Sequence, residues 1–302
     1  MFNGAGVLYL FDTLMKAHFP LLVLAATGIV GCGSEDTQSA GGTTSNEPPA
    51  GALTYYADIK PIFDAKCQSC HESGGIAPFA TDDPVALKEY ASLIKTEVVN
   101  KVMPPWLAAD GCSDYVADSS LDDAQIAKVA KWVDDGAYLG SPEQEGAALE
   151  KEEMYALSRV DLTMQMEIEY TPQAEPDDYR CFVIDWPETE VSYVSGFRAN
   201  PGNPEVVHHV IAFLATPDQA AEVDALDEAD PGVGYTCFGS AGGSVQAWVG
   251  AWAPGSEGTD YVAGTGIKVD PGSKVILQVH YNTNTAGKQP DRTSVDFKLD
   301  KE

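Results

Sequence analysis

Basic residues and histidine are scarce in this chain. Its 302 residues include 18 Lys and Arg against 46 Asp and Glu, for a formal net charge of −28, and only five histidines. Such a surface repels phosphate, which argues against nucleic acid as a partner. The sequence also contains no G-x-G-x-x-G, P-loop or G-x-S-x-G motif, so it lacks common signatures of dinucleotide, nucleotide and serine-hydrolase sites.

Long apolar runs are lacking too. The run Phe19–Val30 is too short to span a bilayer alone, and its position after Lys16 is typical of an export signal. It leads into Ile29-Val30-Gly31-Cys32, which resembles the lipobox of bacterial lipoproteins. The resemblance implies that residues 1–32 are a lipoprotein signal peptide and that lipid on Cys32 anchors the chain to a membrane of the bacterial envelope, facing the periplasm or the outside. An ordinary cleaved signal peptide is the alternative.

Composition divides the remaining chain into four parts. Residues 33–52 are rich in Ser, Thr, Gly and Pro and predict a flexible tether. Residues 53–140 show helical spacing, and residues 141–154 form an acidic linker. Residues 155–302 carry short β-prone runs separated by turn residues: Met164–Tyr170, Tyr179–Asp185, Glu190–Phe197, Val206–Leu214, Val245–Trp252 and Lys274–Tyr281. The sequence therefore predicts a multidomain protein, with a small all-α domain followed by an all-β antiparallel sandwich.

The helical part contains Cys67-Gln68-Ser69-Cys70-His71, a C-x-x-C-H sequence. This spacing is the attachment signature of c-type haem, in which two thiols bond to one porphyrin and the histidine ligates its iron. A thioredoxin-like redox pair would follow a strand, whereas the residues before Cys67 have helical spacing. A zinc site would need two further ligands, and beyond His71 the segment offers only Cys112, for which we have no role.

Three helices are expected around this motif. Asp58–Lys66 predicts a short helix that leads into Cys67, with Pro61 in its first turn, and Val85–Asn100 predicts a second. Ser120-Leu121-Asp122-Asp123 resembles a capping box, and it opens a third helix that stops at Gly136.

Met103 is the candidate sixth ligand of the haem iron. It lies between the second and third helices and is followed by Pro104-Pro105, which stiffen the backbone beside its thioether. A methionine that merely fills the core is the alternative.

The segment resembles class I cytochrome c, on Cys67, Cys70, His71, Met103 and the closing helix around Trp132. The resemblance implies an all-α cytochrome domain over residues 53–140. It also implies haem c ligated by His71 and Met103, and electron transfer rather than oxygen binding, because both axial positions of the iron are filled.

Three histidines remain in the β-prone part, His208, His209 and His280. Neighbours in a regular strand point to opposite faces, so one buried and one exposed histidine is the simplest interpretation of His208-His209. Both reach one metal only if the strand twists or bulges there. His280 shares a face with Ile276 and Gln278. Three imidazoles suit copper or zinc.

The sequence segments around these histidines, Glu205–Phe213 and Leu277–Tyr281, are similar to the N-terminal domain of type II, ascorbate-dependent copper monooxygenases. Supporting matches are Asp178-Tyr179-Arg180-Cys181-Phe182, Tyr235-Thr236-Cys237-Phe238 and Ala251-Trp252-Ala253-Pro254, ahead of Gly264-Thr265-Gly266. The resemblance implies that His208, His209 and His280 bind the family's electron-supplying copper, and that Cys181 and Cys237 form a disulfide.

The sequence departs from the family at the ligands of the second copper. In the family, the catalytic copper is held by a His-x-His pair and a methionine in a second domain, whereas no histidine or methionine follows His280 here. We expect a fragment of a longer protein, which the strand-like run Val295–Leu299 near the end favours, or else a naturally shortened relative.

The resulting hypothesis is electron transfer from haem c to a three-histidine copper. The chain would form part of an oxidoreductase, a copper monooxygenase that hydroxylates an unknown substrate with O2. Its electrons would come from a redox partner protein or a small reductant. The alternatives are a membrane-tethered redox relay without catalysis, and a hydrolytic zinc site with Glu205 as its base.

Overall fold

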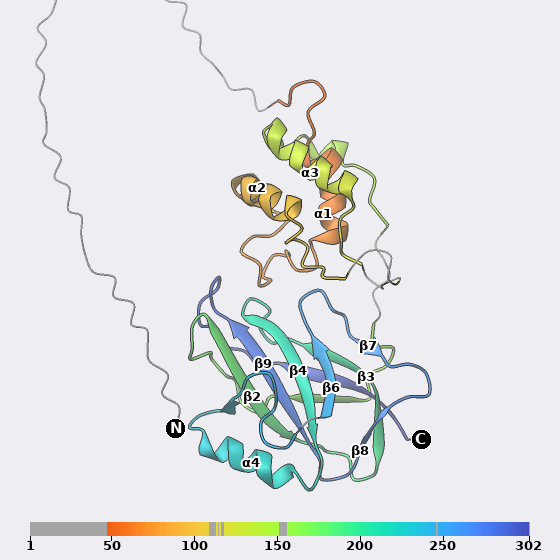
Figure 1. The fold of residues 1–302 in the computed structure, drawn as a ribbon, viewed down its shortest axis with the longest axis vertical. Helices are drawn as coiled ribbons and strands as arrows, with labels where there is room; N and C mark the ends of the chain where they lie inside the picture. The colour runs from red at the N-terminus through yellow and green to blue at the C-terminus, as the bar shows by residue number, and fades with distance from the viewer. Residues whose placement is uncertain are drawn as a thin grey trace, which may run out of the picture. The chain divides into compact units, whose positions relative to one another are not determined.

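Helices come first along the chain and two β-sheets follow, in the computed structural model (Figure 1). It describes residues 47–108, 113, 115, 118–150, 156–245 and 247–301. Asn46–Glu302 form one unit by their contacts. The predicted signal peptide with Cys32, most of the predicted tether and Cys112 lie outside the described residues. No helix in the described part of the chain is long and apolar enough to cross a membrane.

The helical part agrees with the sequence except at its first helix and at the cap of its third helix. Its elements are the π-helical turn η1 (Tyr55–Ile59), α1 (Lys60–Lys66), α2 (Pro84–Val99), α3 (Asp123–Asp135) and the 3-10 turn η2 (Pro142–Gln144). The predicted first helix begins as η1, and Pro61 then lies in the first turn of α1. The capping box before α3 is formed by Asp122 and Gln125, rather than by Ser120. Gly136 ends α3 in the left-handed conformation, at φ 118°.

Large aromatic side chains form the helical core. Tyr55, Phe63 and Trp132 are almost fully buried, and the rings of Phe63 and Trp132 meet edge to face at 6.3 Å. The indole of Trp132 donates a hydrogen bond to the carbonyl of Tyr138 at 2.9 Å, which satisfies its buried N–H. This packing fixes the end of α1, from which the C-x-x-C-H sequence continues.

The first residues of the predicted linker lie against the helical part. The backbone N–H of Gly146 donates to the carbonyl of Tyr56 at 3.0 Å, and Lys60 forms an ion pair with Glu145 at 2.9 Å. Residues 151–155 lie outside the described part of the chain. The cytochrome and linker boundaries remain predictions.

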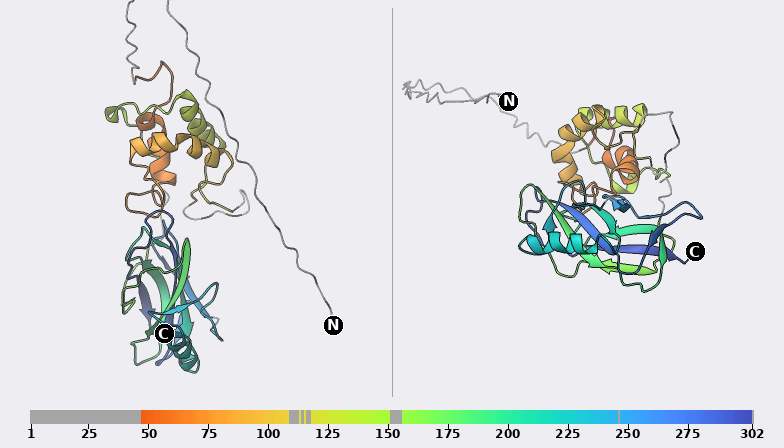
Figure 2. Two further views of the ribbon diagram at one scale, coloured as in Figure 1. Left: turned by 90° about the vertical axis from the view of Figure 1, so that its left-hand side faces the viewer. Right: turned by 60° about the horizontal axis from the view of Figure 1, so that its bottom comes forward.

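Two antiparallel sheets form the rest (Figures 1 and 2). One has the order β1-β10-β3-β7, with β8 also paired to β3, and the other has the order β5-β2-β9-β4-β6. The strands are β1 Leu162–Gln165, β2 Asp177–Asp185, β3 Ser192–Asn200, β4 Val207–Ala215, β5 Tyr235–Thr236, β6 Ala247–Trp252, β7 Thr259–Asp260, β8 Ile267–Val269, β9 Lys274–Asn282 and β10 Ser294–Asp300.

Side chains of the strand β9 contribute to two apolar clusters, because successive residues point to opposite faces of the sheet. Leu277, Val279 and Tyr281 belong to the core between the sheets, which also holds Phe197 and Phe297 from the other sheet. Ile276 belongs instead to a smaller cluster with Cys181, Phe213, Cys237 and Val223. Val223 lies on α4 (Ala220–Ala229), a helix that the sequence analysis did not predict. His280 is on the same side of β9 as Ile276, as predicted, and this side is the outer face of the sheet.

Two predicted strands differ from the structure. The run Met164–Tyr170 is a strand only as far as Gln165, although Tyr170 still pairs with Asp291 in an isolated bridge. The run Val245–Trp252 begins as β6 at Ala247. The closing run Val295–Leu299 lies inside β10, which pairs with both β1 and β3.

The predicted disulfide between Cys181 and Cys237 is confirmed, with a Cα–Cα distance of 5.9 Å. It ties β2 to the segment after β5 and is buried in the outer cluster. The two cysteines are 56 residues apart in the sequence, so the disulfide closes a long loop and stabilises the fold mainly by restricting the unfolded chain.

Replacing both Cys181 and Cys237 by alanine should lower the free energy of unfolding by roughly 2–4 kcal/mol, because the longer loop of the unfolded chain regains its entropy. Urea unfolding followed by near-ultraviolet circular dichroism measures the loss, with the reduced parent protein as the matched control. A double variant as stable as the oxidised parent would contradict this assignment.

Candidate functional site

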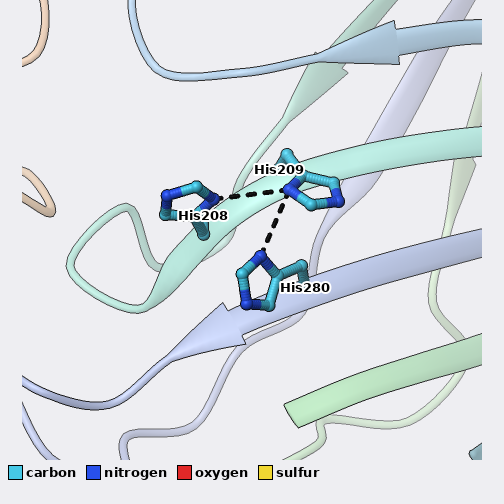
Figure 3. Close-up of side chains that lie close together, drawn as sticks. All are labelled: His208, His209 and His280. Atoms are coloured by element: carbon cyan, nitrogen blue, oxygen red, sulfur yellow. Dashed lines mark hydrogen bonds between the residues drawn. The ribbon is translucent and has the colours of Figure 1, made fainter. Parts of the chain in front are cut away.

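A β-bulge brings the two neighbouring histidines to one side of β4. In the pairing of β4 with β9, Val207 lies opposite Tyr281 and His209 lies opposite His280, with a register shift between Val207 and His209. His208 is therefore the additional residue of the bulge. The sequence analysis required a twist or bulge for both histidines to reach one metal, and the structure provides the bulge. Figure 3 shows the three rings gathered over β4 and β9.

The ring nitrogens lie at distances that fit one metal ion. The Nδ1 atom of His209 is 3.3 Å from Nδ1 of His208 and 3.2 Å from Nδ1 of His280. One candidate ligand atom from each residue lies within 4.8 Å of the other two. Metal–imidazole bonds of about 2.0–2.1 Å place the nitrogens of one coordination shell roughly 3–3.5 Å apart. The residues thus fit a single copper or zinc ion.

Asp177 orients His280 from the far side of its ring. The Nε2–H of His280 donates to Oδ1 of Asp177 at 2.8 Å, and Asn282 donates to the same oxygen at 2.9 Å. A carboxylate only accepts, so the proton of neutral His280 sits on Nε2 and its Nδ1 lone pair faces the other histidines. The hydrogen bond from His280 lowers the pKa of Asp177. The sequence analysis missed Asp177, although it directly precedes the block 178–182.

An aromatic pair restrains the same imidazole. Tyr179 lies opposite His280 in the β2–β9 register, and the two rings stack at 4.1 Å with planes only 4° apart. Phe238 meets the Tyr179 ring edge to face at 4.8 Å. His280 is held between a hydrogen bond at one nitrogen and a stacked ring on one face, which fixes its direction before any metal binds.

The environment keeps two of the imidazoles neutral. His208 is exposed, His209 is half-buried and His280 is buried. Although part of the His208 side chain is exposed, loss of water around its ring and the neighbouring His280 lower its pKa. Burial lowers the pKa of His209 to about 4, with further contributions from His280 and His208. Neutral imidazole is the form that binds metals, so these two residues are ready for a metal at neutral pH.

Glu205, the base required by the zinc alternative, is exposed, and its backbone N–H bonds to the side chain of Asn203. Among the described residues the metal-binding group consists of the three histidines alone. The carboxylate bonded to the cluster, Asp177, accepts hydrogen bonds from His280 and Asn282. Among the residues that the structure describes, Asp177 therefore positions His280, and the exposed Glu205 is not part of the metal-binding group.

The C-x-x-C-H sequence forms a tight turn at the end of α1. The N–H groups of Cys70 and His71 both donate to the carbonyl of Cys67, at 3.1 and 3.0 Å. Nδ1 of His71 lies 3.1 Å from the carbonyl of Phe79, which can only accept, so Nδ1 carries the proton and Nε2 keeps a free lone pair. The Phe79 ring also lies 4.6 Å from that of His71. The sequence analysis missed Phe79 as a residue that orients His71.

A cavity of about 720 Å³ joins the predicted haem ligands. Cys67, Cys70, His71 and Met103 all line it, and its volume lies within the roughly 300–1,000 Å³ of sites for organic ligands. Both thiols are free. Burial raises the pKa of Cys67 to about 12 and also raises that of Cys70, whereas a thioredoxin-like pair needs a readily formed thiolate.

The fold and site define a class: an antiparallel sandwich that carries a three-histidine metal site at a strand bulge. Residues 161–288 match the family model described as copper type II ascorbate-dependent monooxygenase, N-terminal domain. The match contains all three histidines and both disulfide cysteines. This family consists of copper monooxygenases, which are oxidoreductases, and it supports copper as the metal of the cluster. The search of curated proteins gave no match to the chain.

Replacing Asp177 by asparagine should weaken copper binding by about 10–100-fold, because an uncharged amide oxygen orients and polarises the Nε2–H of His280 less strongly than a carboxylate does. Competition titration against a chelator measures the change. Asp185→Asn is the matched control, since Asp185 lies at the opposite end of β2 and pairs with Lys274. Equal copper affinities for the two variants would contradict a role of Asp177 in copper binding.

Proposed function

We propose that this chain transfers single electrons from a covalently bound haem c to a three-histidine copper site. It would do so as part of a monooxygenase that hydroxylates an organic substrate with O2. The observation that carries the proposal is the convergence of His208, His209 and His280 at a bulge, inside the stretch 161–288 that matches the copper monooxygenase family. Haem and copper would supply one-electron carriers, and the chain's residues hold and orient them.

At the copper site, the residues would act chiefly by preorganisation. The bulge directs His208 and His209 to one point, while Asp177 and Tyr179 hold His280. A rigid ligand set reduces the rearrangement that accompanies a change of oxidation state, which favours electron transfer.

At the haem site, the two thiols would each add across a vinyl group. The sulfur bonds to one vinyl carbon and the thiol hydrogen goes to the other, so the step needs no external oxidant. His71 would offer Nε2 to the iron, because its Nδ1–H is committed to Phe79. Met103, which lines the same cavity, would offer its thioether as a second protein ligand to the iron.

The proposed reaction sets the chain's requirements. Hydroxylation of a C–H bond by O2 consumes two electrons and two protons and releases water, so a redox partner protein or a small reductant must supply the electrons singly through the chain. Lipid on Cys32 would keep the protein at the bacterial envelope, on the periplasmic or extracellular face.

Metal content and oxidation state test the proposal on the full chain. We expect one haem iron and one copper per chain, a Cu(II) spin-resonance spectrum with nitrogen splitting, and oxidation of the reduced haem when Cu(II) is added without oxygen. His209→Ala, the matched variant, should retain haem but lose this oxidation.

Three results would contradict the proposal: a chain without haem, zinc in place of copper, or a haem that stays reduced with copper loaded. Haem oxidation without any substrate hydroxylation, in the presence of O2 and a copper monooxygenase partner domain, would leave a redox relay and overturn the catalytic part.

A further inference from the structure

The cavity that holds the predicted haem ligands has a second wall, which comes from the sandwich. Cys67, Cys70, His71 and Met103 line one part of it. His208 and the continuous segment Ala253–Thr259 line another part. A copper ligand thus faces the same cavity as the C-x-x-C-H sequence. Below, Ala253–Thr259 is called the wall segment.

The wall segment contacts the haem motif directly. Sγ of Cys70 lies 3.3 Å from the carbonyl oxygen of Pro254. Gly255 has φ +89°, and a Cβ atom there would lie 3.1 Å from Oγ of Ser69 and 3.5 Å from Sγ of Cys70. Position 255 therefore favours glycine for its backbone conformation and for this close approach.

The wall segment is also fixed to the copper-binding strand. It continues from Trp252, the last residue of β6, which pairs with Val210 directly after His209. The indole of Trp252 donates to the carbonyl of Ser256 at 2.8 Å, and Ser256 N–H bonds back to Ala253 at 3.0 Å. These bonds hold the wall segment as a turn, so its place follows from that of β4.

We propose that the wall segment and His208 complete the haem-binding cavity, so that haem and copper occupy adjoining parts of one site. The redox and magnetic properties of each metal then depend on the other. The inference rests on the proposed function, because it needs both groups to be bound. It adds that the copper-binding sheet supplies part of the haem environment, through Pro254, Gly255 and His208.

The test is the effect of one metal on the other in the full chain. In the parent protein, Cu(II) should shift the midpoint potential of the haem, and oxidised haem should speed the spin relaxation of Cu(II). Gly255→Ala should reduce both effects at least severalfold, because its methyl group presses on Ser69 and Cys70. Gly264→Ala is the matched control: Gly264 has φ +78°, and a Cβ there meets nothing within 4 Å.

A compensating variant separates this contact from simple backbone strain. Ser69→Gly removes the nearest atoms and leaves Cys70 Sγ at an ordinary 3.5 Å from the added methyl group. The double variant Ser69→Gly/Gly255→Ala should regain much of the coupling between the metals. Strain in the wall segment alone would not be relieved at Ser69.

The outcomes separate the inference from the function on which it rests. A parent protein that binds haem and copper with no effect of either on the other overturns the inference and leaves the proposed binding intact. Equal effects of Gly255→Ala and Gly264→Ala also overturn it. A parent protein without haem fails at the earlier step, and the proposed function then fails with it.

Discussion

The metal site depends on one additional residue in β4. Because β9 has no counterpart for His208, the strand bulges, and two sequence neighbours that would otherwise point to opposite faces converge on His280. The rest of the sheet is regular enough to keep Val207 and Val210 in the apolar core on the other side. The bulge thus provides a metal ligand without removing a core residue, which explains how an outer face of a sandwich can hold three imidazoles.

The two candidate sites follow the same electrostatic rule at different places in the fold. His280 donates one ring N–H to Asp177, and His71 donates one to the carbonyl of Phe79. In each ring the partner decides which nitrogen keeps its lone pair, and hence where a metal can bind. A carboxylate partner makes an imidazole a stronger electron donor to a metal than a carbonyl partner does, so the two candidate ligands differ in donor strength.

Local signals in the sequence predicted most elements, and long-range geometry accounts for what they missed. Helical spacing and capping residues located α2 and α3, and β-prone runs located the longer strands of the sandwich. The bulge was stated only as a condition, since it depends on the register of β4 against β9. Asp177, Tyr179 and Phe79 were missed as site residues, because each acts by its position across a strand or turn. The helix α4 was missed because its acidic, alanine-rich sequence lies between strand signals.

Continuity of the backbone explains how the two sites become neighbours. His209 and Val210 lie on β4, Val210 pairs with Trp252, and Trp252 leads into Pro254 and Gly255 beside the cysteine motif. Only a few residues of paired strand and one tight turn separate a histidine of the three-histidine cluster from Cys70. Short, hydrogen-bonded connections of this kind have little conformational freedom, so a displacement of the bulge would also displace the wall segment that lines the cavity. The same connection means that the fold that forms the three-histidine cluster also places the wall segment against the C-x-x-C-H sequence.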